Sequence, residues 1–393
     1  MIIKDGKVFF HGDFVQKDIL IEDGKIVKIG NNISGESIVN AAGKLVLPGL
    51  IDPHVHLREP GATEKEDFLT GSKAAIAGGF TTVIDMPNNS PPTTTAEALM
   101  KKGELSKKAL CNVLFHFGAT DDNFEEVKLA HPDSLKIYLG KTTGNMVLQN
   151  PGSLEKHYDI FPKDKPIVLH ACDHSENEDE NLTRTYKTIK AAIALAKSKG
   201  RKIHLAHAAT KKELALARPF PNVTVEVAPH YLFLSTKDLP ALGTKYKVYP
   251  PLKSEQKRLM LLSAFEEADC IATDHAPHTL ADKEMGAAGF PGLETSLALM
   301  LTACNNGLLT RSSVIKKMSE NPASIFGISG KGKIEEGFDG DITIVDPKKE
   351  WKVKGSELET KCKWSPFEGK TLTGKVYSVI RSGKTVFENY TFI

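Results

Sequence analysis

The sequence predicts an α/β protein: a (β/α)8 barrel of the TIM type with a small discontinuous β-sandwich domain formed by both termini. In the middle of the chain, short β-branched runs alternate with longer helix-like segments, which indicates a parallel sheet with helical crossovers. Both ends instead carry short β-prone runs separated by turn signals, as in antiparallel sheets. Because chain termini commonly lie close together, we expect residues 1–47 plus 329–393 to form one β-domain and residues 48–328 to form the barrel.

Eight candidate strands can be counted in the middle of the chain, which is the number that such a barrel requires. Their ranges are 50–56, 81–86, 112–118, 134–140, 166–171, 202–208, 224–229 and 270–276. Helix-like segments lie between them, for example 65–79, 95–108, 182–199 and 254–268. The run KKGELSKK (101–108) is expected to be an exposed helical face. Active sites of these barrels lie at the C-terminal ends of the strands, so reactive side chains should gather there.

Chemically unusual side chains do follow the strand ends: His54, His56, Asn88, His170, His207, His230, Asp274, His275 and His278. In a strand, the His-x-His pattern places both imidazoles on one face, because side chains alternate with a period of two. Imidazole and carboxylate ligands without thiolates suit zinc with an open coordination position. We expect Glu226, His230 and His275 to support such ligands, and His204 to be structural.

Lys136 departs from this pattern because it lies inside the fourth strand, in step with Ser134 and Tyr138. A lysine that faces the barrel interior needs a partner, since burying an ammonium group alone is costly. Burial readily lowers the pKa of lysine, and a neutral amine can react with carbon dioxide to give an anionic carbamate. As a carbamate, Lys136 would bridge two metal ions.

The composition excludes several other classes of protein. The 51 basic and 49 acidic residues leave a formal net charge of +2, which argues against a nucleic-acid partner. The five cysteines are odd in number and show no C-x-x-C spacing, which favours reduced thiols and a cytoplasmic location. No signal peptide is visible, and the apolar runs are short and interrupted, so we expect no membrane partner.

Several motifs resemble those of the dihydroorotases in the amidohydrolase superfamily. They are PGLIDPHVHLREPG (48–61), MPNNSPPT (86–93), LKIYLG (135–140), EVAPHYLFLS (226–235), ATDHAPHT (272–279), GFPGLETSLALML (289–301) and WSPFEG (364–369). The resemblance covers nearly the whole chain in the expected order. It implies the same architecture that the strand count predicts.

The resemblance also implies the ligands of two zinc ions: His54, His56, Lys136, His170, His207 and Asp274. The two histidines of the first strand bind the more buried ion with Asp274, and the other two histidines bind the second ion. Lys136 is implied to be N6-carboxylysine that bridges both ions, which places the chain in the lysine-bridged branch of the family. Two bridged ions would lower the pKa of water to about 7 and polarise the attacked carbonyl.

The family's substrate-binding residues map onto Arg58, Asn88 and His278, which are implied to hold the substrate's carboxylate. The carboxylate of Asp274 is expected to accept a proton from water and return it to the leaving ring nitrogen. The segment GKTTGNM (140–146) has the composition of a mobile loop, and we expect Thr142 or Thr143 to close over the substrate.

Together these features predict the reversible hydrolysis of dihydroorotate to N-carbamoyl-aspartate, a step of pyrimidine biosynthesis. One alternative is a sister cyclic amidase acting on hydantoin, dihydropyrimidine or allantoin rings, whose usual substrates leave Arg58 without a carboxylate to pair with. Another is a non-catalytic scaffold, although scaffolds tend to lose ligands and all six positions are filled here. A homodimer is the base-rate expectation, and association with aspartate carbamoyltransferase stays open.

Overall fold

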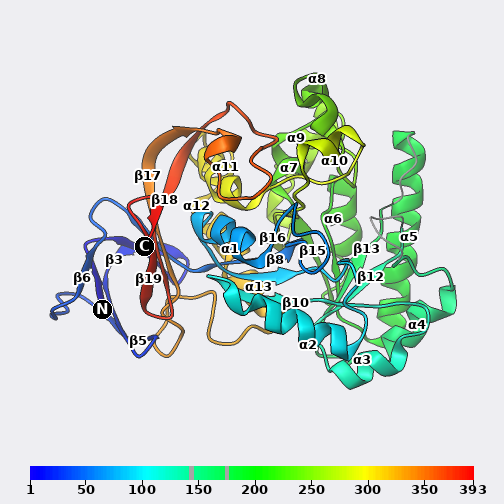
Figure 1. Cartoon of the computed structure of the whole chain (residues 1–393), viewed down its shortest axis with the longest axis horizontal. Helices are drawn as coiled ribbons and strands as arrows, with labels where there is room; N and C mark the ends of the chain where they lie inside the picture. Colours follow the sequence, from blue (N-terminus) through cyan, green and yellow to red (C-terminus); the bar gives the residue numbers. More distant parts are fainter. Residues whose placement is uncertain (141–145, 173–176) are drawn as a thin grey trace.

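The computed structural model of the chain describes residues 1–140, 146–172 and 177–393. Strands from the two chain ends lie together at one end of the molecule, on the left in Figure 1, and the strands and helices of the middle segment form the remainder. This arrangement confirms the predicted fold class, a barrel with a β-domain drawn from both termini.

The barrel strands are parallel, and they follow one another in sequence order. Their bounds are β8 Leu50–Val55, β9 Phe80–Asp85, β10 Asn112–Phe115, β11 Phe117–Gly118, β12 Leu135–Tyr138, β13 Ile167–His170, β14 Ile203–Leu205, β15 Val223–Val227 and β16 Cys270–Ile271. The ring closes where the backbone N–H of His56 donates to the carbonyl oxygen of His275 at 2.8 Å. The C-terminal ends of the strands therefore meet at one mouth.

The predicted strand 112–118 differs from the structure because it is interrupted at His116. The segment before this residue pairs with β9, and the segment after it pairs with β12. The ring of His116 lies inside the barrel, with Nδ1 2.6 Å from the hydroxyl of Ser134 and Nε2 2.8 Å from the carbonyl oxygen of Pro53. These polar contacts fill the interior where the chain changes its strand partner.

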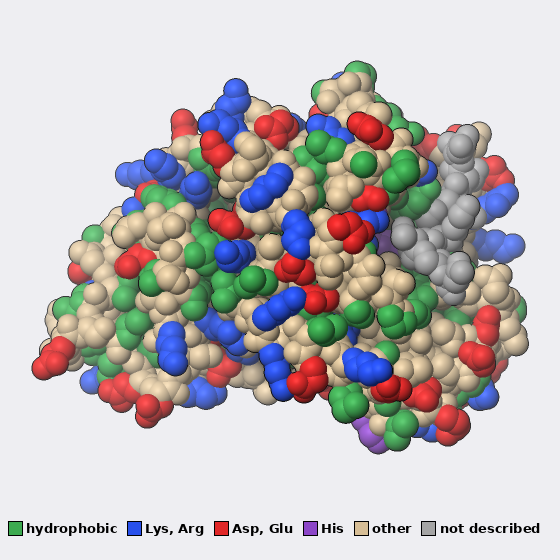
Figure 2. Space-filling model, viewed as in Figure 1, with side chains coloured by type: hydrophobic (Ala, Val, Ile, Leu, Met, Phe, Trp, Pro, Cys, Tyr) green, Lys and Arg blue, Asp and Glu red, His purple; other side chains and the backbone are tan. Residues whose placement is uncertain are grey.

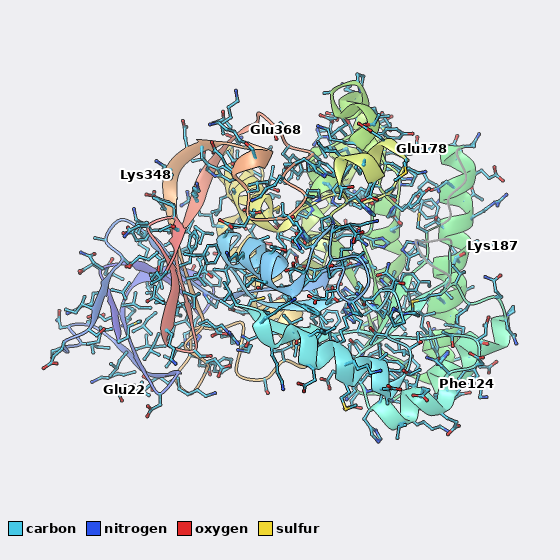
Figure 3. All side chains as sticks on the ribbon, viewed as in Figure 1. Glu22, Phe124, Glu178, Lys187, Lys348 and Glu368 are labelled. Atoms are coloured by element: carbon cyan, nitrogen blue, oxygen red, sulfur yellow. The ribbon has the colours of Figure 1, made fainter. Side chains whose placement is uncertain are left out.

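Helices surround the barrel (Figure 1). Their bounds are α1 Phe68–Ala77, α2 Ala96–Leu105, α3 Phe124–Ala130, α4 Pro151–Ile160, α5 Glu178–Lys199, α6 Lys211–Ala217, α7 Pro229–Phe233, α8 Leu239–Leu242, α9 Glu255–Ser263, α10 Leu280–Glu284, α11 Leu293–Asn305, α12 Arg311–Met318 and α13 Glu320–Ile325. In α5 the labelled Lys187 points to solvent (Figure 3), whereas Ile189 and Ile193 are buried against the barrel. This amphipathic pattern explains why the helix packs on the strands.

The β-domain consists of two sheets that share a core. One sheet has the order β5-β4-β1-β6, with bounds Lys25–Gly30, Asp18–Glu22, Ile2–Lys4 and Ile38–Asn40. The other has the order β20-β19-β18-β17-β7-β2-β3, with bounds Thr391–Phe392, Lys384–Glu388, Thr371–Arg381, Ile342–Lys352, Leu45–Pro48, Lys7–Phe10 and Asp13–Gln16. The second sheet joins the two chain ends, because β17 pairs with β7. The boundaries predicted at 47/48 and 328/329 remain predictions.

The surface carries both signs of charge. Figure 2 shows Lys and Arg side chains interspersed with Asp and Glu side chains over the visible face. This distribution fits the formal net charge of +2. Within the described part of the chain, none of the helices is long and apolar enough to cross a membrane.

Candidate active site and metal centre

A hollow of about 460 Å³ lies at the C-terminal mouth of the barrel. The residues that line it are His54, His56, Arg58, Asn88, Lys136, Tyr138, His170, His207, Val248, Tyr249, Asp274, Ala276, Ala288 and Gly289. All six predicted metal ligands are among them, and so are two of the three predicted substrate-binding residues. The structure thus brings together residues from six different strand ends, as the barrel architecture requires.

The two histidines at the C-terminal end of β8 converge on one carboxylate oxygen. Nε2 of His54 lies 3.3 Å from Oδ1 of Asp274, and Nε2 of His56 lies 3.2 Å from the same atom. Their other ring nitrogens are already held, since Nδ1 of His54 lies 2.5 Å from Oε1 of Glu226 and Nδ1 of His56 lies 2.8 Å from Oδ1 of Asn88. Because each Nδ1 donates to an oxygen, Nε2 is the nitrogen left to bind a metal ion.

A second pair of imidazoles faces the first. Nδ1 of His170 lies 2.9 Å from Nε2 of His207, and the two ring centres are 4.8 Å apart. The rings of His54 and His207 are 5.4 Å apart, so the two pairs are neighbours. Four imidazoles therefore converge at one side of the hollow.

Lys136 comes between the two histidine pairs in the sequence, and its side chain is fully buried. Its Nζ has no hydrogen-bond partner among the described residues. Burial lowers the pKa of this amine to about 8, so a neutral form is accessible near physiological pH. The amine lies 5.2 Å from the centre of the Tyr138 ring, and conversion to a carbamate would give the buried group the hydrogen-bonding or metal partners that it lacks among the described residues.

The protonation states also suit metal binding. Burial lowers the pKa of His56 to about 4 and that of His207 to about 3, so both imidazoles are neutral at pH 7. Burial opposes ionisation of Asp274, but His54 and His56 beside it hold the pKa of its carboxyl well below the usual range. Neutral imidazoles and an ionised carboxylate are the forms that bind metal ions.

The donor set therefore fits a metal centre. His54, His56 and Asp274 offer ligand atoms that all lie within 4.8 Å of one another. No cysteine is among the described residues that line the hollow. Nitrogen and oxygen donors without thiolates, beside an open hollow, are typical of a catalytic rather than a structural zinc site.

Glu226 lies directly behind this centre and is 1% exposed. Besides holding His54, its Oε1 accepts the backbone N–H of His207 at 3.0 Å, and its Oε2 lies 3.0 Å from Nε2 of His204. One carboxylate thus contacts a residue from each histidine pair. The sequence predicted support for the ligands from Glu226, but not that it reaches both pairs.

The remaining histidines near the mouth are placed differently. His204 is fully buried and lies between Glu226 and the hydroxyl of Thr224, 2.8 Å from its Nδ1, as expected of a structural residue. Nδ1 of His275 accepts the backbone N–H of Gly292 at 3.1 Å. His230 is 3% exposed and packs edge-on against Phe290, with ring centres 5.5 Å apart.

Arg58 and His278 form the opposite wall. Nε of Arg58 donates to the carbonyl oxygen of Pro277 at 3.0 Å, and Nη2 lies 3.0 Å from Nε2 of His278. Burial and the positive charge of Arg58 lower the pKa of His278 to about 2, so its imidazole is neutral, and the same Nε2 also lies 3.0 Å from the carbonyl oxygen of Ala288. The guanidinium forms no ion pair with a described acidic residue.

Asn88 has a contact that the sequence did not predict. Its side-chain oxygen holds His56, so Asn88 supports a metal ligand as well as lining the hollow. Its side-chain NH2 group makes no hydrogen bond to a described residue, and it is the donor left for a substrate. Thr142 and Thr143, the predicted lid residues, lie outside the described residues.

Three site residues have left-handed backbone conformations. The φ angles are +64° at Arg58, +40° at His207 and +47° at Asp274. Residues other than glycine rarely adopt such angles, and the strain persists only where the surroundings fix it. Strained residues cluster at active sites, which agrees with this location.

Sequence reasoning missed two tyrosines of the hollow, Tyr138 and Tyr249. Tyr138 could have been found, because it lies two residues after Lys136 on the same strand face. Tyr249 lies in a segment without regular structure, and no signal in the sequence indicated it.

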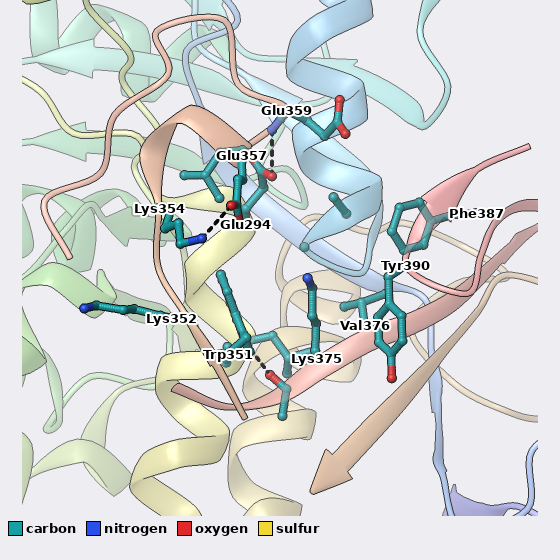
Figure 4. Close-up of a pocket in the computed structure, with 16 residues that line it drawn as sticks. Glu294, Trp351, Lys352, Lys354, Glu357, Glu359, Lys375, Val376, Phe387 and Tyr390 are labelled. Carbon is teal, nitrogen blue, oxygen red and sulfur yellow. Dashed lines mark hydrogen bonds and ion pairs between the residues drawn. The ribbon is translucent and has the colours of Figure 1, made fainter. Parts of the chain in front are cut away.

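A second hollow, of about 680 Å³, lies between α11 and the strands β17 and β18 (Figure 4). Several of its charged groups already have partners: Glu294 accepts the backbone N–H of Glu359 at 2.9 Å, and Lys354 pairs with Glu357 at 2.8 Å. No histidine is among the described residues that line it. The strand-end hollow is therefore the better candidate for the active site.

Comparisons with known proteins agree with this choice. A model of the Amidohydrolase family matches residues 45–386. A dihydroorotase of Thermococcus kodakarensis is 40% identical, over 98% of this chain and 94% of the relative, and one of Methanosphaera stadtmanae is 34% identical, over 95% and 93%. A segment of the multifunctional protein CAD of Squalus acanthias is 38% identical, over 87% of this chain and 15% of that protein.

Among solved structures, an L-hydantoinase (dihydropyrimidinase) from Arthrobacter aurescens has a TM-score of 0.95 at 27% identity, covering 100% of this chain and 97% of the other. A dihydropyrimidinase from Brevibacillus agri has a TM-score of 0.89 at 25% identity, covering 100% and 96%.

Proposed function

The chain belongs to the amidohydrolase family and, within it, to the dihydroorotases, and from this membership we propose how its strand-end hollow works. The enzyme is a cyclic amidohydrolase that interconverts (S)-dihydroorotate and N-carbamoyl-L-aspartate in pyrimidine biosynthesis. In one direction, water adds across the ring amide and the C–N bond breaks. In the biosynthetic direction, the ring closes and water leaves.

One observation carries the assignment to this substrate: a guanidinium without an acidic partner among the described residues lies in the same hollow as the converging imidazoles. Arg58 is held by Pro277 and His278, and its remaining N–H groups are available to an anion. A guanidinium binds a carboxylate in a planar, bidentate arrangement. The ring carboxylate of dihydroorotate supplies that partner, and the NH2 group of Asn88 is a further donor.

For the metal centre we propose two zinc ions. The residues that would hold them are His54, His56, Lys136, His170, His207 and Asp274, with Lys136 as N6-carboxylysine. The unpartnered Nζ of Lys136 and the two converging histidine pairs support this proposal. When bound, the ions supply a low pKa for water and polarisation of the attacked carbonyl.

The protein's own groups then perform the proton transfer and the positioning. The carboxylate of Asp274 is ionised at neutral pH, so it accepts the proton that water loses and returns it to the ring nitrogen as the C–N bond breaks. Arg58, Asn88 and His278 hold the ring in one orientation, which saves the entropy of aligning it. Ring closure follows the same steps in reverse.

The second candidate is a sister cyclic amidase, and the TM-score of 0.95 to a hydantoinase favours it. The sequence comparisons favour the dihydroorotase instead, because relatives of that name are 40% identical to this chain, against 27% for the hydantoinase. A neutral ring also leaves the half-buried guanidinium of Arg58 without an anionic partner among the described residues. All six proposed ligands line one hollow, which argues against a non-catalytic scaffold.

We also propose a homodimer in the cytoplasm, based on the commonest symmetric assembly and on five free cysteines. The relative that forms part of a multifunctional protein supports association with another enzyme, for which aspartate carbamoyltransferase is the candidate.

The test is turnover by the purified, zinc-loaded protein of dihydroorotate, N-carbamoyl-aspartate, hydantoin, dihydrouracil and allantoin. We expect the first two compounds to interconvert, and a chelator to stop the reaction. Preference for a neutral ring would support the sister cyclic amidase. If none of the compounds is turned over, both the dihydroorotase and the sister amidase are contradicted.

A further inference from the structure

Lys102 lies on α2, outside the barrel, yet its side chain is fully buried. The expectation of an exposed helical face over 101–108 is therefore wrong at this position. Its neighbour Lys101 fits the expectation, since its side chain is 68% exposed and pairs with Glu97. Burying an ammonium group is costly unless it is paired and hydrogen-bonded, so the partners of Lys102 are informative.

Those partners lie at the end of β9 and in the loop after it. Nζ of Lys102 lies 2.6 Å from Oδ2 of Asp85, and it donates to the carbonyl oxygen of Met86 at 2.8 Å and to Oδ1 of Asn89 at 2.6 Å. The ammonium thus holds Met86, two residues before Asn88, and Asn89, directly after it.

The same cluster reaches the loop after β8. The other carboxylate oxygen of Asp85 accepts the backbone N–H of Leu57 at 2.6 Å. The side-chain NH2 group of Asn89 donates to the carbonyl oxygen of Glu59 at 3.0 Å. Both residues are direct neighbours of Arg58, whose φ of +64° must be maintained by its surroundings.

Two substrate-binding residues from different strands are therefore fixed by one buried ion pair. A buried ion pair adds little stability compared with apolar side chains of similar volume. Its effect here is to orient the backbone, because it fixes oxygen and N–H groups in the loops after β8 and β9. Precise positioning of groups that bind substrate is worth large factors in rate.

We propose that Lys102 and Asp85 are positioning residues that set the arrangement of Arg58 and Asn88, and through it the preference for a ring that carries a carboxylate. The inference rests on the proposed function and deepens it. Neither residue touches the substrate. Their main effect is on the binding of the substrate's carboxylate, and a smaller effect on the metal centre is expected because Asn88 also holds His56.

The experiment compares Lys102→Met with Lys101→Met, a matched lysine on the exposed face of the same helix. For each zinc-loaded variant, kcat and KM are measured with dihydroorotate and with its uncharged carboxamide. We expect Lys102→Met to lower kcat/KM for dihydroorotate by about 10- to 100-fold, mainly through KM, and that for the carboxamide by less than about 3-fold. Lys101→Met should match the wild type on both compounds.

Zinc content and Tm are measured on the same samples, and Asn89→Ala is a second variant. It removes the link from Asn89 to Glu59 while leaving the buried ion pair in place, so it tests the proposal if Lys102→Met fails to fold. The expected result is again a loss for dihydroorotate that exceeds the loss for the carboxamide.

Three outcomes are decisive. A variant that folds, holds zinc and matches the wild type would overturn the inference. Equal losses on both compounds would also overturn it, because the pair would then act on the metal centre or the whole fold. Absence of dihydroorotate turnover by the wild type would instead contradict the proposed function itself.

Discussion

Replacing Glu226 by glutamine should weaken zinc binding while leaving the fold intact. The carboxylate contacts Nδ1 of His54, Nε2 of His204 and the backbone N–H of His207. Burial opposes its ionisation, but the neighbouring His54 and His204 hold its pKa well below the usual range, so it is an anion. The substitution removes this charge and turns one acceptor oxygen into a donor.

The size of the expected loss in zinc affinity follows from the contacts that each substitution leaves in place. In the glutamine variant Oε1 still accepts from His54 and from the backbone of His207, and only the contact with His204 must change its donor. Loss of such support weakens metal binding by about 10- to 100-fold, or about 1.4 to 2.7 kcal/mol. We expect Glu226→Gln near the lower value and Glu226→Leu, which keeps no acceptor, near the upper one.

The assay is zinc competition with a chromogenic chelator, followed by turnover at saturating zinc. Glu213→Gln is the matched control: Glu213 is also buried, but it accepts from Ala209 and Thr210 and contacts none of the proposed ligands. Wild-type zinc affinity in both Glu226 variants, or an equal loss in the control, would refute the supporting role of Glu226.

Three further predictions follow from single contacts. Arg58→Met should raise KM for dihydroorotate at least about 30-fold in steady-state kinetics, because loss of one partner of a buried charge pair costs about 2 kcal/mol or more; an unchanged KM would remove the carboxylate assignment. Lys136→Met should lower kcat by at least about 100-fold and reduce the bound zinc measured by metal analysis, since it removes the proposed bridge. Burial raises the pKa of Glu294 from 4.5 to about 7, so the folded carboxyl binds its proton more tightly than the unfolded one. Stability should therefore fall by at most about 3 kcal/mol as pH rises through that window, and a Tm series should show no such contribution in Glu294→Gln.

Much of the barrel could be predicted because its signal is local. Buried parallel strands are short apolar runs, and the eight predicted ranges overlap the observed strands. The exception is His116, where the apolar run continues although the chain changes its strand partner. A run of residues in one chain does not reveal which neighbour each part of it pairs with.

The site could be predicted as a set of residues but not as a set of contacts. The strand ends indicated the histidines and Asp274, since a barrel brings those ends together. The reach of Glu226 to both histidine pairs depends on three-dimensional spacing that no periodicity encodes. Lys102 was misjudged for the same reason: charged residues on a helix usually face solvent, and only the structure shows Asp85 behind it.

The most direct test of the account is a steady-state comparison on the zinc-loaded protein between dihydroorotate and dihydrouracil, two rings that differ in the carboxylate. We predict kcat/KM for dihydroorotate to exceed that for dihydrouracil by about 100-fold or more, since a site built to bind a polar group rejects the analogue that lacks it. Equal values, or a preference for dihydrouracil, would contradict the assignment of Arg58, Asn88 and His278 to the substrate's carboxylate and the function that depends on it.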